Sequence, residues 1–177
     1  MDLKLAEFLL GITLVFCGSL LIAYRERCES FLRKFLRSEF ANTVLFSLAG
    51  AWFLGHILNL GESDFGQYKY FFFVFFLIII LISLFKIRDF LSVRGVAILA
   101  LLTSNELLEA AYMEPYQSRL FLVTFVYAMI VSGMTLGGWP YKGRDFVDFL
   151  FFKPTNSRLF GMLTTGYGIL VLSTLFW

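Results

Sequence analysis

Charged residues are scarce in this sequence of 177 residues. Asp, Glu, Lys and Arg together make up 16% of the chain, whereas apolar side chains make up 59% and aromatic side chains 19%. Soluble domains average about 45–50% apolar and about 25% charged residues. The composition therefore excludes an ordinary soluble domain and indicates a membrane protein. Because the basic residues fall between apolar runs and not along one polar face, no nucleic-acid partner is expected.

Cysteine and histidine are also scarce, which limits the chemistry that the chain can support. Cys17 and Cys28 would lie about 16 Å apart along a helix, too far to bridge, and His56 is the one histidine. A zinc site needs three or four nitrogen, oxygen or sulfur ligands, so we expect no metal and no cofactor. Sequence motifs of hydrolases, zinc proteases and phosphate-binding loops are missing as well. An intramembrane enzyme is the least favoured function class.

Long apolar runs are abundant, and six of them are close to the ~20 residues that cross a bilayer core of ~30 Å. They cover residues 5–24, 41–60, 70–85, 94–113, 119–139 and 158–177. The first run lacks the basic start and the cleavage signature of a signal peptide, so we expect it to be retained. The sequence predicts an all-α, polytopic membrane protein with six transmembrane helices in a single domain, residues 1–177.

Two basic stretches, residues 25–40 and 141–157, separate some of these runs. Apolar residues recur in them at helical spacing, and cations take many of the other positions. This pattern is typical of amphipathic helices that lie in the membrane surface. The cations expected to contact anionic lipid head groups are Arg27, Arg33, Lys34, Arg37, Arg144 and Lys153. The lipid bilayer is therefore the first expected partner.

The distribution of Lys and Arg predicts the orientation. Twelve of the fifteen lie in the connections after the first, third and fifth runs, and only three lie on the opposite face. Short cytoplasmic loops carry the excess of Lys and Arg in membrane proteins. We therefore expect cytoplasmic elbows and extracytoplasmic termini, in a bacterial inner (plasma) membrane.

A repeat is visible in the layout. Residues 1–60, 61–114 and 115–177 each hold two apolar runs joined by a basic connection, and the tripeptide Arg-Asp-Phe occurs in two of the connections, at 88–90 and 144–146. Three helical hairpins around an axis along the membrane normal would follow, as in parallel-repeat transporters. Such a layout, with both termini outside, resembles that of the proton-gated urea and amide channels. The resemblance is one of architecture and assigns no site residue.

Polar side chains interrupt two of the predicted spans. The fourth run contains Asn105, Glu106 and Glu109, although an acidic residue at the centre of a membrane helix costs about 2.5–3.5 kcal/mol. In the second run, His56 and Asn59 lie at a similar depth, in the outer half of the membrane, by a rise of 1.5 Å per residue. These five residues are the candidate polar site. They could accept a proton, bind a cation or form a selectivity constriction.

Two functions remain open. The first is a small channel or transporter for a small solute, a proton or a cation, and it is favoured by the acidic cluster inside the membrane. The second is a non-catalytic structural or assembly subunit, which would need no polar site and agrees with the lack of transport motifs. Correspondingly, the protein partner is either a second copy of the chain or a larger membrane complex. Glu109 also has a simpler interpretation as an interfacial residue at the membrane surface.

Overall fold

A computed structural model describes residues 2–61, 65–86, 91–116 and 118–176, without the side chains at 37 and 176. The described chain is all-helical, with eight α-helices and two short 3-10 helices, η2 (Gly66–Tyr68) and η3 (Thr174–Phe176). The α-helices are α1 (Leu3–Ala23), α2 (Arg25–Arg37), α3 (Glu39–Leu58), α4 (Lys69–Lys86), α5 (Leu91–Ala111), α6 (Arg119–Gly138), α7 (Tyr141–Phe152) and α8 (Pro154–Ser173). The tripeptide at 88–90 lies outside the described residues.

Among the described residues, five helices are long and apolar enough to cross a membrane, as expected for an integral membrane protein. They are α1, α3, α5, α6 and the continuous segment Gly66–Lys86, which contains α4. The C-terminal helix α8 has 20 residues but is not among them. Polar residues near its start, among them Asn156 and Arg158, lower its mean hydropathy. The sixth predicted span is therefore not confirmed by composition.

Local sequence signals break the chain into these helices. Ser38 caps α3, because its side chain accepts a hydrogen bond from the Ala41 N–H at 3.2 Å. Pro154 occupies the first turn of α8 and keeps the preceding Lys153 extended. The helix breaks therefore fall a few residues before the expected ends of the basic stretches at residues 40 and 157: α3 begins at Glu39, and α8 begins at Pro154.

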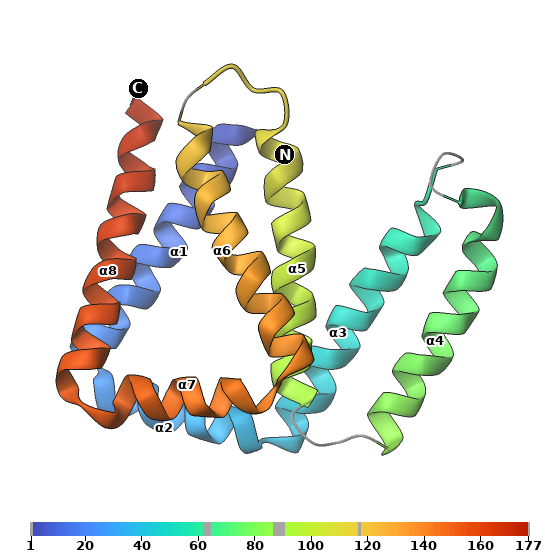
Figure 1. Cartoon of the computed structure of the whole chain (residues 1–177), viewed down its shortest axis with the longest axis horizontal. Coiled ribbons are helices and arrows are strands. Elements are labelled where there is room, and N and C mark those ends of the chain that lie inside the picture. Colours follow the sequence, from blue (N-terminus) through green and yellow to red (C-terminus); the bar gives the residue numbers. More distant parts are fainter. Residues whose placement is uncertain (1, 62–64, 87–90, 117, 177) are drawn as a thin grey trace.

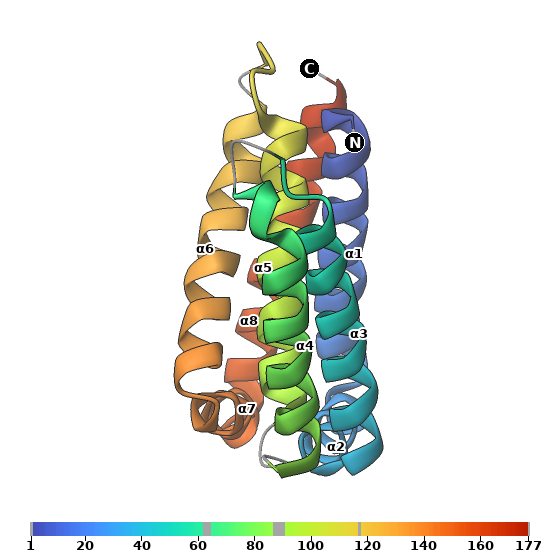
Figure 2. The same cartoon turned by 90° about the vertical axis from the view of Figure 1, so that its right-hand side faces the viewer.

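The helices are arranged as a bundle with two transverse helices at one end (Figure 1). Helices α2 and α7 lie side by side across this end, and both termini lie at the opposite end. The axes of the remaining α-helices are roughly aligned in the view of Figure 2, and the chain direction reverses between α3 and α4 and between α5 and α6. The most extensive contacts join α1 to α8, α5 to α6, and α3 to α5. The first and last α-helices are therefore neighbours.

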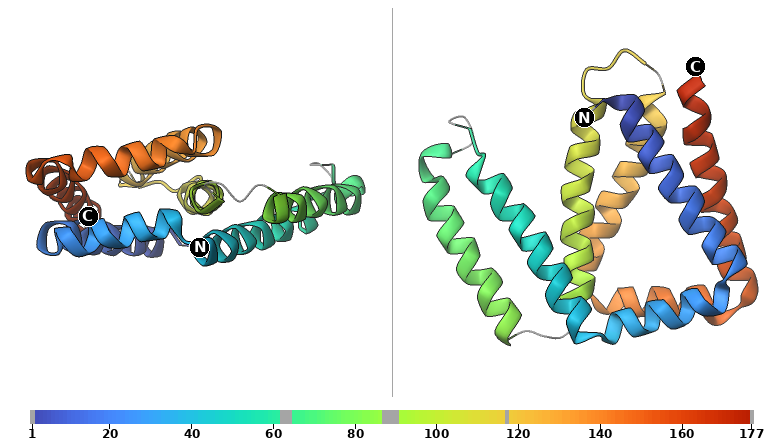
Figure 3. Two further views of the ribbon diagram at one scale, coloured as in Figure 1. Left: turned by 90° about the horizontal axis from the view of Figure 1, so that it is seen from below. Right: turned by 180° about the vertical axis from the view of Figure 1, so that it is seen from behind.

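The predicted arrangement of three hairpins is not confirmed. Helix α2 has 13 residues, which corresponds to about 20 Å of helix. It therefore holds α1 and α3 apart at its two ends, and α7 separates α6 from α8 in the same way (Figure 3). Each basic stretch is long enough to be a helix in its own right, so it acts as a spacer and not as a tight turn.

Two apolar clusters hold the bundle together. At the end that carries the termini, Leu3 and Ala6 of α1 pack with buried residues of α5 and α6, among them Leu107 and Leu122. At the other end, Val147, Leu150 and Phe151 of α7 pack with partly buried residues of α1 and α2. Helix α1 contributes to both clusters and so connects the two ends of the bundle.

Candidate functional site

The structure brings together His56 and Glu106, which come from different helices. His56 lies in the last turn of α3, and its Nε2 atom is 3.6 Å from Oε1 of Glu106 on α5. The side chains are 36% and 41% exposed, but Nε2 itself is buried and has no hydrogen-bond partner among the described residues. When His56 is protonated, the two groups form an ion pair. The pair is thus a proton-dependent polar link between two helices.

Close packing of α3 against α5 makes this pairing feasible. A Cβ atom added at Gly95 of α5 would lie 3.1 Å from the backbone nitrogen of Phe46, so a larger residue would push the two helices apart by a few tenths of an ångström. Nearby, the side-chain oxygen of Asn42 on α3 accepts a hydrogen bond from the backbone N–H of Ser92 at 2.9 Å. Both contacts fix the register of the two helices, which brings the two polar side chains to the same level.

Of the remaining predicted site residues, Asn105 and Glu109 contact each other, whereas Asn59 lies apart. Asn105 and Glu109 lie one turn apart on α5, and the Asn105 amide donates a hydrogen bond of 2.9 Å to Oε1 of Glu109. Both residues are exposed. Asn59 follows the end of α3 and is also exposed; its backbone N–H donates to carbonyl groups of the last turn. No described side-chain contact joins Asn59 to the other four residues.

A cavity of about 530 Å³ adjoins the pair, between α3, α4 and α5. His56 and Asn105 are its polar lining residues, and the rest of its wall is apolar. The apolar lining consists of Phe46, Gly50, Phe53, Phe76, Ile79, Ile80, Ile98, Leu101 and Leu102. The candidate site is therefore a polar pair beside an apolar groove.

One acidic residue was missed by the sequence analysis. Glu7 lies on α1 and is only 2% exposed, and its Oε1 atom has no hydrogen-bond partner among the described residues. A carboxyl group within the first apolar run was the available signal, because acidic residues inside membrane spans are rare and usually functional. Glu7 belongs with Glu106 among the acidic residues to be tested.

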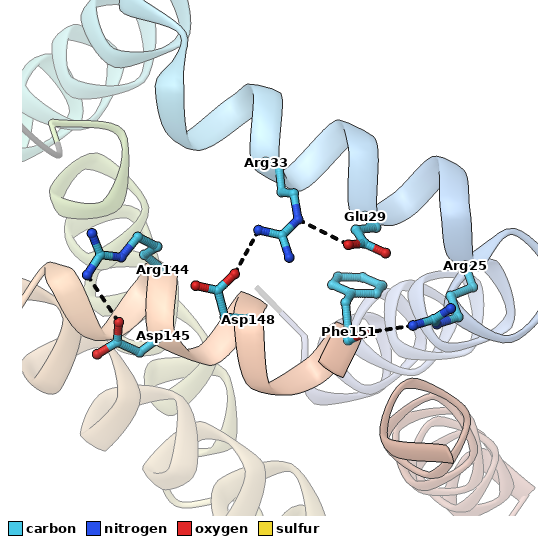
Figure 4. Close-up of polar contacts among 7 residues, drawn as sticks. All are labelled: Arg25, Glu29, Arg33, Arg144, Asp145, Asp148 and Phe151. Carbon is cyan, nitrogen blue, oxygen red and sulfur yellow. Dashed lines mark hydrogen bonds and ion pairs between the residues drawn. The ribbon is translucent and has the colours of Figure 1, made fainter. Parts of the chain in front are cut away.

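Two of the residues predicted to anchor the membrane surface, Arg33 and Arg144, lie on the transverse helices α2 and α7 (Figure 4). Arg33 of α2 donates to Asp148 of α7 at 2.7 Å and to Glu29 of its own helix at 3.1 Å. These hydrogen bonds raise the pKa of the Arg33 guanidinium above its ordinary value, and the bond to Asp148 has the larger effect. In addition, Arg25 donates to the Phe151 carbonyl at 2.7 Å. Arg33 is therefore a link between α2 and α7 as well as a candidate anchor.

Among the side chains that the structure describes, the other predicted anchoring residues make no such link between helices. The guanidinium of Arg27 lies 5.4 Å from the centre of the Tyr24 ring, and Arg144 contacts Asp145 on its own helix at 3.5 Å. Lys34 and Lys153 are exposed. The side chain of Arg37 lies outside the described part of the chain.

Reversing the charge of either Arg33 or Asp148 is expected to destabilise the protein, and reversing both is expected to restore most of the stability. Arg33→Asp should lower the melting temperature in detergent, because it places three carboxylates together, and Asp148→Arg should lower it by placing two guanidinium groups together. The double variant should recover most of the loss in each case. Melting curves of the four proteins test this, with Arg144→Asp as the control that bridges no helices. If the decrease in melting temperature of the double variant equalled the sum of the two single decreases, Arg33 and Asp148 would contribute no coupling energy to stability.

No family model, curated protein or solved structure matches this chain.

Proposed function

We propose that this chain is a small integral membrane transport protein, a channel or a transporter, that passes a proton, a cation or a small solute. Its path includes Glu106 and His56, with Asn105 and Glu109 as the next polar groups. The observation that carries the proposal is the distance of 3.6 Å between His56 Nε2 and Glu106 Oε1, on two helices that are apolar enough to cross a membrane. Ionisable residues at such places usually belong to ion pathways or proton relays.

The proposal includes an orientation in a bacterial inner membrane. In it, α8 is the sixth span, because α8 packs along α1, which is apolar enough to cross a membrane. The transverse helices α2 and α7 are elbows in the cytoplasmic surface, where their cations meet anionic lipids. Both termini, which lie at the other end of the bundle, are then extracytoplasmic.

Flux through purified protein tests the function directly. Liposomes that contain a trapped pH-sensitive dye are given a potassium gradient with valinomycin, and proton entry is followed after reconstitution. Parallel liposomes test sodium entry and, by light scattering, the entry of urea as a small neutral solute. The proposal expects flux of at least one of these above that of protein-free liposomes. Rates equal to those of empty liposomes for all three would contradict it.

A second function is favoured by α4. None of the described residues of α4 is buried, and its surface includes Phe71, Phe75, Ile78 and Ile82, which are all at least 49% exposed. Such a face suits lipid, but it also suits a helix of another protein. A non-catalytic structural or assembly subunit of a larger membrane complex would use α4 in this way.

Solubilisation in a mild detergent separates the two functions. If the chain is a subunit, tagged protein should bring down other membrane proteins in a fixed ratio. An α4 variant with Phe75→Ala and Ile78→Ala should lose them, whereas the same number of changes on α6, at Val131 and Met134, should not. Recovery of the chain only as a monomer or homo-oligomer would contradict the subunit function and leave transport.

A further inference from the structure

A second cavity, distant from His56, lies where the transverse helices meet α5 and α6. Its volume is about 710 Å³, within the roughly 300–1,000 Å³ of small-molecule sites. The walls come from α2, α5, α6 and α7 and are mostly apolar. The lining residues used below are Ser132, Thr135, Lys142, Asp145, Phe146 and Phe149.

The two hydroxyl groups of the wall are already satisfied by the protein. The hydroxyl of Ser132 donates to the Ala128 carbonyl at 2.8 Å, and that of Thr135 donates to the Val131 carbonyl at 2.7 Å. Phe146 and Phe149, in contrast, remain 46% and 66% exposed. The inner part of the cavity therefore offers carbon surface without free hydrogen-bonding groups, which suits a hydrocarbon chain.

The rim of the cavity carries an uncompensated cation. Lys142 is exposed, and its Nζ atom lies 4.7 Å from the centre of the Trp139 ring. Within the described chain, no carboxylate lies within ion-pairing distance of Lys142. The nearby carboxylate of Asp145 faces Arg144 at 3.5 Å, so its charge is partly offset (Figure 4). Lys142 and Phe146 are four residues apart on α7, which places the cation above the apolar wall.

We propose that this cavity binds an anionic phospholipid of the leaflet that contacts α2 and α7. An acyl chain fills the apolar part, and the phosphate group meets Lys142. Charge complementarity selects the occupant: the cavity needs an amphiphile with a hydrocarbon chain and a negative head, and lipids of this class surround cationic elbows in a membrane. The proposal depends on the orientation of α2 and α7 in the membrane surface, but not on transport.

Fluorescence of Trp139 tests the site, because this ring lies beside Lys142. In a variant with Trp52→Phe and Trp177→Phe, Trp139 is the one remaining tryptophan. The protein is reconstituted in phosphatidylcholine vesicles, to which phosphatidylglycerol or phosphatidylcholine with brominated acyl chains is added at equal mole fraction. Brominated phosphatidylglycerol should reach half-maximal quenching at a mole fraction about fivefold lower than brominated phosphatidylcholine does. This is the preference expected from one cation near the membrane surface.

Two variants and one control test whether the cavity holds an anionic phospholipid or another occupant. Lys142→Glu should abolish the preference, and Ser132→Phe should weaken it by filling the cavity while keeping the cation. Lys69→Glu, at the start of α4 and outside the transverse helices, should leave it unchanged. Equal quenching by the two lipids would overturn the proposal, as would a preference that survives Lys142→Glu. Absence of quenching by either lipid would also overturn it, because a second copy or another protein would then cover Trp139.

Discussion

Replacement of Glu106 by glutamine is expected to lower flux through the reconstituted protein by about a hundredfold. Glutamine keeps the shape of the side chain but cannot take up a proton or pair with a protonated His56. An unpaired ionised group inside the membrane costs up to about 2.5–3.5 kcal/mol, and about 2.7 kcal/mol corresponds to a factor of about 100 in rate. The rate of entry into liposomes, relative to that with the unmodified chain, measures the effect.

Matched variants separate a specific effect from a general loss of negative charge. Glu114→Gln removes a carboxylate beyond the end of α5 and should leave flux unchanged. His56→Gln should reproduce the loss, because the pair is broken from the other side. All three variants should give the same melting temperature within error, since the His56 and Glu106 side chains are partly exposed. Unchanged flux in Glu106→Gln, in a protein that does conduct, would remove Glu106 from the path.

The apolar runs could be found from the sequence because they depend only on local composition. Five of the six predicted spans coincide, within a few residues, with helices that are apolar enough to cross a membrane. Gly133 and Gly137 lie four residues apart in the fifth apolar run, a spacing that predicts close approach of another helix. A Cβ added at Gly133 would lie 3.3 Å from the Ala97 carbonyl oxygen of α5. Its companion Gly137 is not equally confined, because the nearest such contact there is 3.9 Å.

Contacts between helices that are far apart in the sequence could not be predicted from local composition. The similar depth of His56 and Glu106 followed from the rise per residue, but their direct contact depends on how α3 packs on α5. The pairing of α1 with α8 joins the two ends of the chain, and no local pattern specifies it. Glu7 was missed because an isolated acid near the start of an apolar run also suits the membrane surface; its burial becomes visible only after α1, α5 and α6 are assembled.

The contact between α1 and α8 is expected to be the most sensitive part of the fold to added volume. Gly11 and Gly18 of α1 lie opposite Gly168 and Gly161 of α8, and the interval of seven residues keeps each pair on one helix face. A Cβ added at Gly168 would lie 2.9 Å from the Gly11 carbonyl oxygen and 2.9 Å from Cβ of Leu14. Because a backbone atom cannot move aside cheaply, Gly168→Ala should lower the free energy of unfolding by about 1–3 kcal/mol. Gly168→Leu should prevent α1 and α8 from packing.

The same helix supplies the control. Gly166 is two residues away on α8, and a Cβ added there would meet no atom within 4 Å. Gly166→Ala should therefore leave stability unchanged or raise it by up to about 1 kcal/mol, through the better helix propensity of alanine. Unfolding by SDS in mixed micelles, followed by far-UV circular dichroism, compares the variants on one scale. If Gly166→Ala and Gly168→Ala gave equal stability, α1 and α8 would not be in backbone contact. The packing argument for α8 as a sixth span would then fail, because that argument depends on α8 lying against α1 along its length.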